Sequence, residues 1–154
     1  MRTFDPNNSA EGFVPTRDQV DDFLISQKLA SLATLTNDGS PTVARVAFSV
    51  TEGHELIIGT SADSRKSRNM NRDPRVAVEV TDPERRYTVQ IEGFARLLAQ
   101  AAFEAEYAER HYAQRPESLP FRDEPGQAHF LITPDYLRFS DCSVKPWLLT
   151  ELDS

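Results

Sequence analysis

The first amphipathic segment of the chain has a helical period and a clear start. Thr16-Arg17-Asp18-Gln19 has the pattern of a capping box, in which a hydroxyl caps the helix and a glutamine three positions later reaches back. Val20, Phe23 and Leu24 then form one apolar stripe at helical spacing. A helix ending near Gln27 is therefore predicted.

From residue 29 the hydrophobic pattern changes to the period of two that is typical of strands. It predicts strands at 29–36, 42–50 and 55–60, separated by the turn signals Asn37-Asp38-Gly39 and Glu52-Gly53. Two successive hairpins indicate an antiparallel meander.

The second half of the chain continues this pattern after one polar, basic interruption. Residues 61–73 are predicted to be a loop and a helix of about two turns, with Asp63 or Ser64 as N-cap. The elements expected after it are a strand at 75–81, a strand at 87–100 that bends at Gly93, a helix at 101–113, a loop at 116–126, a strand region at 127–141 with a turn at Pro134, and a tail at 142–154 without a clear period.

These elements predict a mainly β (α+β) fold with about six antiparallel strands and short peripheral helices. Open edges on such a sheet are costly, so closure into a six-stranded antiparallel barrel is expected. The chain divides into a polar N-terminal arm at 1–15 and a single domain at 16–154.

Composition narrows the classes of function. The net charge of −7 argues against a nucleic-acid binder, and no apolar run has the length of a membrane span. The lone Cys142 cannot form an internal disulfide, and the N-terminal residues lack the apolar core of a signal peptide. A cytoplasmic protein is the expectation.

The segment from Gly59 to Asn69 carries the chemistry. It leaves a strand, turns and starts a helix, whose N-terminus offers unpaired N–H groups and a partial positive charge to an anion. Ser61 and Ser64 add hydroxyl donors, while Arg65 and Lys66 place positive charge where the helix alone disfavours it. A phosphate is the simplest ligand for this turn.

A solvated basic helix is the alternative interpretation of the same segment. Arg65, Arg68 and Arg72 fall on one helical face, as surface residues do. Lys66 instead lies on the side of Asn69 and Met70, which should meet the barrel, so Lys66 is the stronger phosphate candidate.

Several motifs occur in an order that resembles one known family. They are Gly39-x-Pro41, Arg45-Val46-Ala47-Phe48, Thr60-x-x-x-Ser64-Arg65-Lys66, Asn71-Arg72-Asp73-Pro74-Arg75-Val76 and Glu92-Gly93-x-Ala95. Over about residues 29–98 the chain resembles the pyridoxamine 5′-phosphate oxidase-like family of FMN-binding split β-barrels.

This resemblance implies a cofactor site at the interface of a homodimer. Residues Arg45, Val46, Ala47 and Phe48 would line the flavin, with Arg45 near the phosphate. The ribityl phosphate would be held by Thr60, Ser64, Arg65 and Lys66, together with Ser61, and Thr88 would stand near the ring.

Three departures from the family pattern predict a substrate other than pyridoxamine phosphate. Counted from Gly39, the phosphate-binding arginine of the family falls on Ala44, so Arg45 requires a bulge or a shifted register. The substrate lysine of the family falls on Ser49, and its C-terminal substrate motif is not found in residues 142–154.

No catalytic side chain or metal site is identified. The three histidines, His54, His111 and His129, lack the spacing of metal ligands. His111 lies beside two tyrosines and could face a substrate cavity, but a position on a surface helix is favoured. Cys142 is expected to be structural.

Three functions remain open. The first is an FMN-dependent oxidoreductase that acts on a small molecule with a nicotinamide or organic electron donor. The second is a deazaflavin-dependent reductase of the same superfamily, indicated by the Lys66-x-x-Asn69 pattern. The third is a flavin-binding or sensing protein without turnover.

Overall fold

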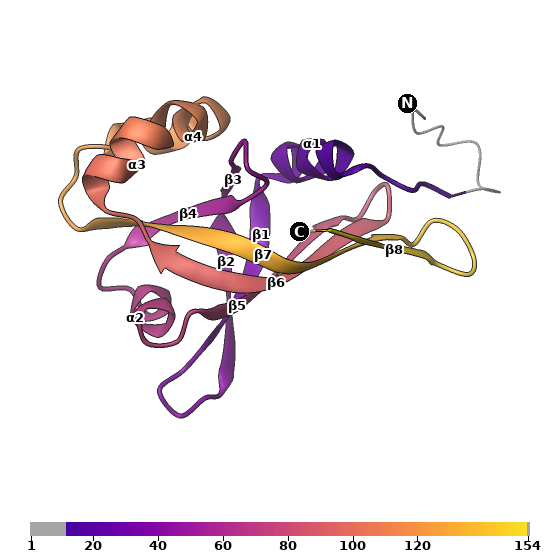
Figure 1. Cartoon of the computed structure of the whole chain (residues 1–154), viewed down its shortest axis with the longest axis horizontal. Coiled ribbons are helices and arrows are strands. Elements are labelled where there is room, and N and C mark those ends of the chain that lie inside the picture. The colour runs from indigo at the N-terminus through magenta and orange to yellow at the C-terminus, as the bar shows by residue number, and fades with distance from the viewer. Residues whose placement is uncertain (1–11, 154) are drawn as a thin grey trace.

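The computed structural model describes residues 12–153, a curled antiparallel sheet with helices around it (Figure 1). Residues 1–11 of the predicted arm lie outside the described part. The elements are α1 (Arg17–Gln27), β1 (Leu29–Leu35), β2 (Pro41–Ala47), β3 (Ser49–Val50), β4 (Leu56–Ser61), α2 (Arg65–Arg72), β5 (Arg75–Asp82), β6 (Tyr87–Leu97), α3 (Gln100–Glu106), α4 (Ala108–Gln114), the 3₁₀ helix η1 (Pro116–Phe121), β7 (Gln127–Asp141) and β8 (Leu148–Leu152).

The sheet closes through a single chain segment. Its strand order is β2-β1-β5-β6-β7-β4-β3, with β8 added to β7. The two ends of this order, β2 and β3, are consecutive in the chain and separated by Phe48 alone. Because one segment supplies both ends of the order, the sheet curls back on itself, and the fold is the expected mainly β split barrel.

The strand count differs from the prediction for two reasons. The strand predicted at 42–50 divides at Phe48, where the chain passes from pairing with β1 to pairing with β4. The tail expected to lack a period contains β8, which pairs with residues 137–141 of β7. The sheet therefore has eight strands instead of six.

Gly93 marks the bend predicted in the long sixth strand. The register between β6 and β7 shifts between Glu92 and Gly93, so that Gly93 pairs with Pro134 while Glu92 pairs with Tyr136. Pro134 therefore does not end β7; the turn predicted there is a bulge. A Cβ at Gly93 would lie 2.2 Å from the carbonyl oxygen of Thr133, which explains the glycine.

Two apolar clusters hold the elements together. The larger one fills the barrel and includes Leu24 of α1, Ile58, Phe130 and Phe139. A smaller cluster lies outside the barrel, where α3 and α4 cover β4 and β7. The elements that carry this second cluster also line the two cavities around His111 described below.

The helices follow the sequence signals where caps are present. Thr16 forms both hydrogen bonds of the capping box of α1, and Ser64 caps α2. The helix predicted at 101–113 is instead two helices that meet at Tyr107, and the loop predicted at 116–126 begins with η1. Phe13, which belongs to the described part of the arm (residues 12–15), packs on the rings of Tyr87 and Phe139.

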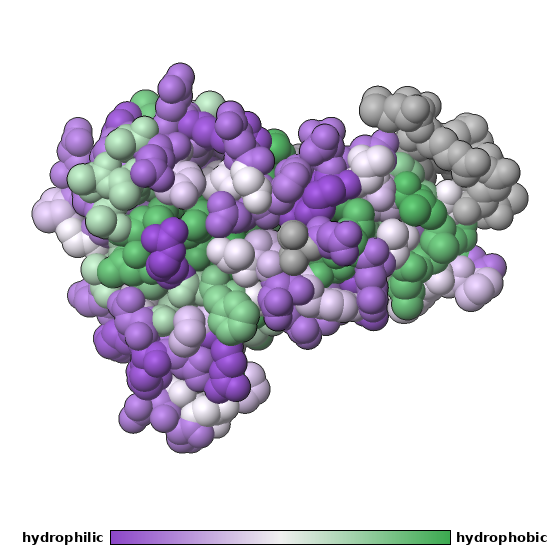
Figure 2. All heavy atoms as spheres, viewed as in Figure 1, coloured by the Kyte–Doolittle hydropathy of each residue, from purple (hydrophilic) through white to green (hydrophobic). Residues whose placement is uncertain are grey.

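Polar side chains cover most of the visible face, with apolar patches between them (Figure 2). Phe94 and Leu97 of β6 are exposed apolar residues, as are Leu29 and Val43 on β1 and β2. Within residues 12–153, none of the helices has the length and apolarity needed to cross a bilayer.

Candidate functional site

A network of hydroxyl groups shapes the turn between β4 and α2. Ser64 accepts a hydrogen bond from the amide of Ser67 at 3.2 Å, and its Oγ also lies 3.2 Å from the hydroxyl of Thr60. The Oγ of Ser67 donates to the carbonyl of Ser61 at 2.6 Å, and Ser61 donates to Asp63 at 2.5 Å. The structure therefore brings together Thr60, Ser61 and Ser64, as predicted, and adds Ser67, which is fully buried.

The capping arrangement leaves positive groups at the start of α2. The cap uses the amide of Ser67, and the amide of Arg68 bonds to the Ser64 carbonyl, so the amides of Arg65 and Lys66 have no intrahelical partner. The first turn contains no acidic residue. Lys66 is half-buried, and no residue among 12–153 forms an ion pair or hydrogen bond with its ammonium group. This turn has the donors and charge to bind a phosphate.

The arginines of α2 face another direction. Arg65, Arg68 and Arg72 are exposed and line a surface cavity of about 460 Å³ between α2 and the β1–β2 turn. Arg68 donates to the carbonyl of Asp63, and Arg72 donates to the side chain of Asn69. Arg65 thus lies on the solvent-exposed face of α2, as the interpretation of a solvated basic helix predicted. Lys66 lies on a different side of the helix, where it is half-buried.

Asn69, a predicted cofactor ligand, is held by protein groups. Its side chain is buried, its Nδ2 donates to Thr34 at 3.1 Å, and its Oδ1 accepts from Arg72 at 3.2 Å. In this structure Asn69 fastens α2 to β1 and so fixes the position of Lys66.

The four residues predicted to line the flavin alternate along β2 and into Phe48. Val46 and Phe48 point into the barrel core, whereas Arg45 and Ala47 lie on the outer face. The pairing of β2 with β1 is regular from Leu29–Ala47 to Leu35–Pro41, without a bulge. Arg45 therefore faces outward by normal strand alternation, without a bulge or a shifted register. Ala44 points to the same face of the strand as Val46.

Thr88 lies far from the turn between β4 and α2 within one chain. It pairs with Thr81 near the β5–β6 turn, whereas α2 ends beside Arg75 at the opposite end of β5. Six residues of extended strand separate these ends by roughly 20 Å. On β7, Thr60 of the turn before α2 pairs with Ala128 and Thr88 pairs with Ser140, twelve residues further along, so a single chain does not bring Thr88 and this turn into one site.

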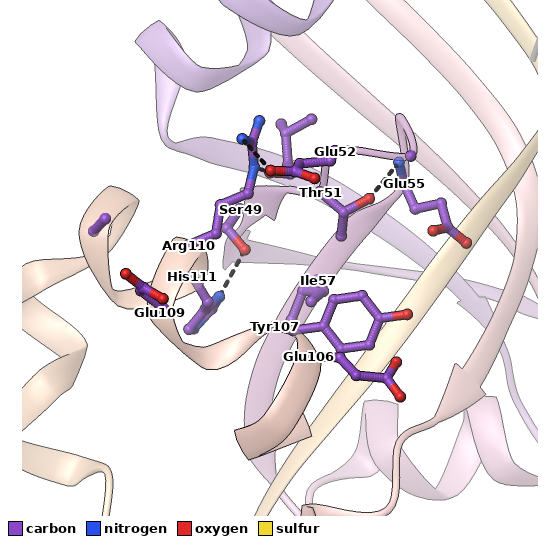
Figure 3. Close-up of a pocket in the computed structure, with 13 residues that line it drawn as sticks. Ser49, Thr51, Glu52, Glu55, Ile57, Glu106, Tyr107, Glu109, Arg110 and His111 are labelled. Carbon is purple, nitrogen blue, oxygen red and sulfur yellow. Dashed lines mark hydrogen bonds and ion pairs between the residues drawn. The ribbon is translucent and has the colours of Figure 1, made fainter. Parts of the chain in front are cut away.

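His111 occupies a buried position that the sequence did not reveal. It is 5% exposed, and its Nδ1 lies 2.6 Å from the Oγ of Ser49 (Figure 3). The preference for a surface helix is therefore wrong for this residue. Burial, followed by the nearby His129 and Arg115, lowers the pKa of His111 to about 4, so its ring is neutral at pH 7.

Two cavities meet at His111. An open one of about 670 Å³ lies between the β3–β4 turn and α3–α4, with the carboxylates of Glu52, Glu55, Glu106 and Glu109 around it (Figure 3). A smaller one of about 110 Å³ lies on the other side, against Ala47 and Gly59. The smaller cavity is adjacent to the segment predicted to line a flavin.

One group of potential metal ligands was missed in the sequence because its members are remote. Ligand atoms of Asp18, Asp21 and His54 lie within 4.8 Å of one another. Both oxygens of Asp21 are already used, by Arg17 at 2.6 Å and by His54 at 2.5 Å. The group ties α1 to the β3–β4 turn.

These features place the molecule in a known class. A curled antiparallel sheet with a helix after β4, and hydroxyl and cationic groups at the start of that helix, defines a split β-barrel. The chain belongs to the pyridoxamine 5′-phosphate oxidase family, whose model matches residues 16–140.

Individual relatives agree with this assignment. The chain is 33% identical over 85 residues to a pyridoxine/pyridoxamine 5′-phosphate oxidase of Chromobacterium violaceum. That match covers 55% of this chain and only 40% of the curated relative.

Two solved structures show the same fold at low identity. A conserved hypothetical protein, Rv2991 of Mycobacterium tuberculosis, has a TM-score of 0.71 at 24% identity, covering 88% of this chain and 90% of that one. A structure named as an F420 reductase has a TM-score of 0.63 at 21% identity, covering 76% of this chain and 94% of that one.

Proposed function

We propose that this protein is an FMN-dependent oxidoreductase that acts on a small molecule. The observation that carries the proposal is the start of α2, where an ammonium and two amides without protein partners lie with hydroxyl groups on one strand-to-helix turn. Lys66 and the amides of Arg65 and Lys66 would bind the phosphate, while Ser64 and Thr60 would orient it. Bound FMN would supply hydride or electron transfer.

The outer face of β2 supports the position of the ring. Arg45 and Ala47 point outward from the strand, and Ala47 borders the small cavity beside His111. A ring over Ala47 would leave that cavity for substrate. The neutral imidazole and hydroxyl groups there would orient a substrate.

Absorbance of the protein as purified tests the cofactor directly. FMN gives a flavin spectrum, and NAD(P)H or an organic donor should bleach it if the protein turns over. Lys66→Ala should weaken FMN binding by about 1.5–3 kcal/mol, or about 10- to 150-fold in Kd. Arg68→Ala is the matched control, because its exposed side chain bonds to the Asp63 carbonyl on the solvated face. Equal affinities of the two variants would refute the phosphate site.

A deazaflavin-dependent reductase is the second candidate. The neighbour named as an F420 reductase and the Lys66-x-x-Asn69 pattern favour it. A colourless protein that quenches deazaflavin fluorescence would select this alternative. FMN that remains oxidised with all donors, without turnover on a redox panel, would instead indicate a flavin-binding or sensing protein.

We also propose a homodimer with the cofactor at its interface. The support is that Thr88 and Thr60 of the Lys66 turn, both predicted around one cofactor, pair with Ser140 and Ala128 of β7, twelve residues apart on that strand, in a single chain. Exposed Leu29 and Val43 on the outer face supply apolar surface for a second copy. Sedimentation equilibrium should give a dimer with one FMN per chain, and Val43→Asp should weaken it. A monomer that binds FMN with full affinity would overturn this arrangement.

A further inference from the structure

The smaller cavity beside His111 is built from separate elements of the fold. Its walls include Ala47 of β2, Gly59 of β4, His129 of β7, and His111 and Arg115 at the end of α4. Its volume of about 110 Å³ corresponds to the liquid volume of roughly three or four water molecules. A group of a few non-hydrogen atoms would fill it.

Two nearly buried side chains in this wall have polar atoms without partners. His129 is 6% exposed, and its Nδ1 has no hydrogen-bond partner in the described part of the chain. Arg115 is also 6% exposed; it donates to the Lys28 carbonyl and pairs with Glu117, but its Nε has no partner among residues 12–153. Buried polar groups are nearly always hydrogen-bonded, so both side chains keep unused hydrogen-bonding capacity beside the cavity.

The histidine rings are held in fixed positions by apolar and hydroxyl contacts. His129 stacks on Phe103 with ring centroids 3.6 Å apart and 7° between the planes. His111 is hydrogen-bonded to Ser49, and the two imidazoles lie edge to face, 5.5 Å between centroids. The cavity therefore has a rigid wall, which lowers the entropic cost of binding a small group.

The charge of the cavity wall determines which kind of ligand the cavity can bind. Burial lowers the pKa of both histidines, so both rings are neutral at pH 7. Arg115 is then the only formal charge among the side chains that line the cavity, and it would repel a cation. Its charge is partly balanced by Glu117, so one negative charge fits the site better than two.

We propose that this cavity binds the carboxylate of a small organic acid and so anchors the substrate. Arginine, hydroxyl and imidazole N–H groups are donors suited to carboxylate oxygens. Placing that substrate against the flavin rests on the proposed function, because Ala47 belongs both to the cavity wall and to the segment proposed to line the ring. Binding of the acid itself does not require the cofactor.

The test is a titration of the full-length protein with propionate, followed through the ¹⁵N and ¹H NMR signals of its three histidine rings. His111 and His129 should shift saturably, while His54, which bonds to Asp21 away from the cavity, should not. Inorganic phosphate, titrated in the same way, should bind at least tenfold more weakly than propionate.

A steric variant tests whether propionate binds in this cavity or elsewhere on the surface. A Cβ at Gly59 would lie 3.3 Å from Cδ2 and 3.4 Å from Nε2 of His129, so Gly59→Ala narrows the cavity without changing its charge. It should weaken propionate binding tenfold or more. Gly53→Ala on the β3–β4 turn adds the same methyl group outside the cavity and should bind propionate like the parent protein.

Three results would overturn the proposal. They are an absence of histidine shifts with propionate, unchanged propionate affinity in Gly59→Ala, and tighter binding of phosphate than of propionate. A protein that binds FMN but gives no histidine shifts would refute the carboxylate site alone. A protein that shows the shifts but binds no flavin would refute the proposed function and retain the acid site.

Discussion

The Oγ of Ser49 and the Nδ1 of His111 lie 2.6 Å apart across 62 residues of sequence, and this buried hydrogen bond joins β3 to α4. Ser49 stands where the family pattern has its substrate lysine. A hydroxyl bonded to a neutral ring stands there in place of a cation, so this part of the wall of the open cavity carries a hydrogen-bonding group instead of a positive charge.

Acid should destabilise the protein through His111. Its pKa of about 4 in the folded state lies below the ordinary histidine value of 6.5, so on acidification the unfolded chain takes up this proton first. The stability contributed by the neutral ring is complete above pH 6.5 and is lost as the pH falls toward 4, by up to roughly 3 kcal/mol.

Urea unfolding between pH 7.5 and 4 measures this effect. His111→Gln should show a shallower fall in the free energy of unfolding than the parent protein. Asp22→Asn, which removes an exposed titratable group of α1, is the control for general effects of acid. Parallel pH profiles of the parent and His111→Gln would contradict the assignment.

Gly93 should tolerate no side chain. Because a Cβ there would lie 2.2 Å from a backbone oxygen of β7, Gly93→Ala must separate β6 from β7 at the bulge. We expect a loss of at least about 3 kcal/mol, or no soluble folded protein. Thermal unfolding should show a much smaller change for Gly53→Ala, whose Cβ would meet only the flexible side chains of Glu55 and Thr51.

The elements predicted from sequence are those set by local chemistry. The capping box at Thr16 and the serine cap at Ser64 are hydrogen bonds between residues close in the chain, and both are confirmed. The strand boundaries before the turn residues 37–39 agree for the same reason. The prediction of an anion-binding turn also needed only neighbouring residues.

The missed features depend on remote partners. β8 is a strand because its backbone pairs with β7, and the division at Phe48 arises because the chain changes its pairing partner there. His111 is buried because His129 and Phe103, from other elements, pack against it. The hydrophobic periodicity within one segment carries no information about its contacts with remote segments.

Asn69 should act on the position of α2. Asn69→Ala removes the partner of the buried Thr34 hydroxyl, which should cost about 1–3 kcal/mol of stability. Thr34→Val in that background should cost less than it does alone, because the hydroxyl has already lost its partner. Urea unfolding of the four proteins in this double-mutant cycle measures the coupling, and strict additivity would show that the hydrogen bond contributes nothing.

Asp21 should be the most sensitive acidic residue of α1. Its carboxylate accepts from Arg17 and His54, and the Arg17 guanidinium, which also donates to the His54 carbonyl, is 15% exposed. Asp21→Ala leaves that charge without its carboxylate, which should cost about 3 kcal/mol in unfolding free energy. Asp22→Ala, one position along and exposed, should change it by less than about 0.5 kcal/mol. The two changes remove the same carboxylate group from adjacent positions of the helix. Equal losses of unfolding free energy in the two variants would therefore show that the contacts of Asp21 with Arg17 and His54 add nothing to stability.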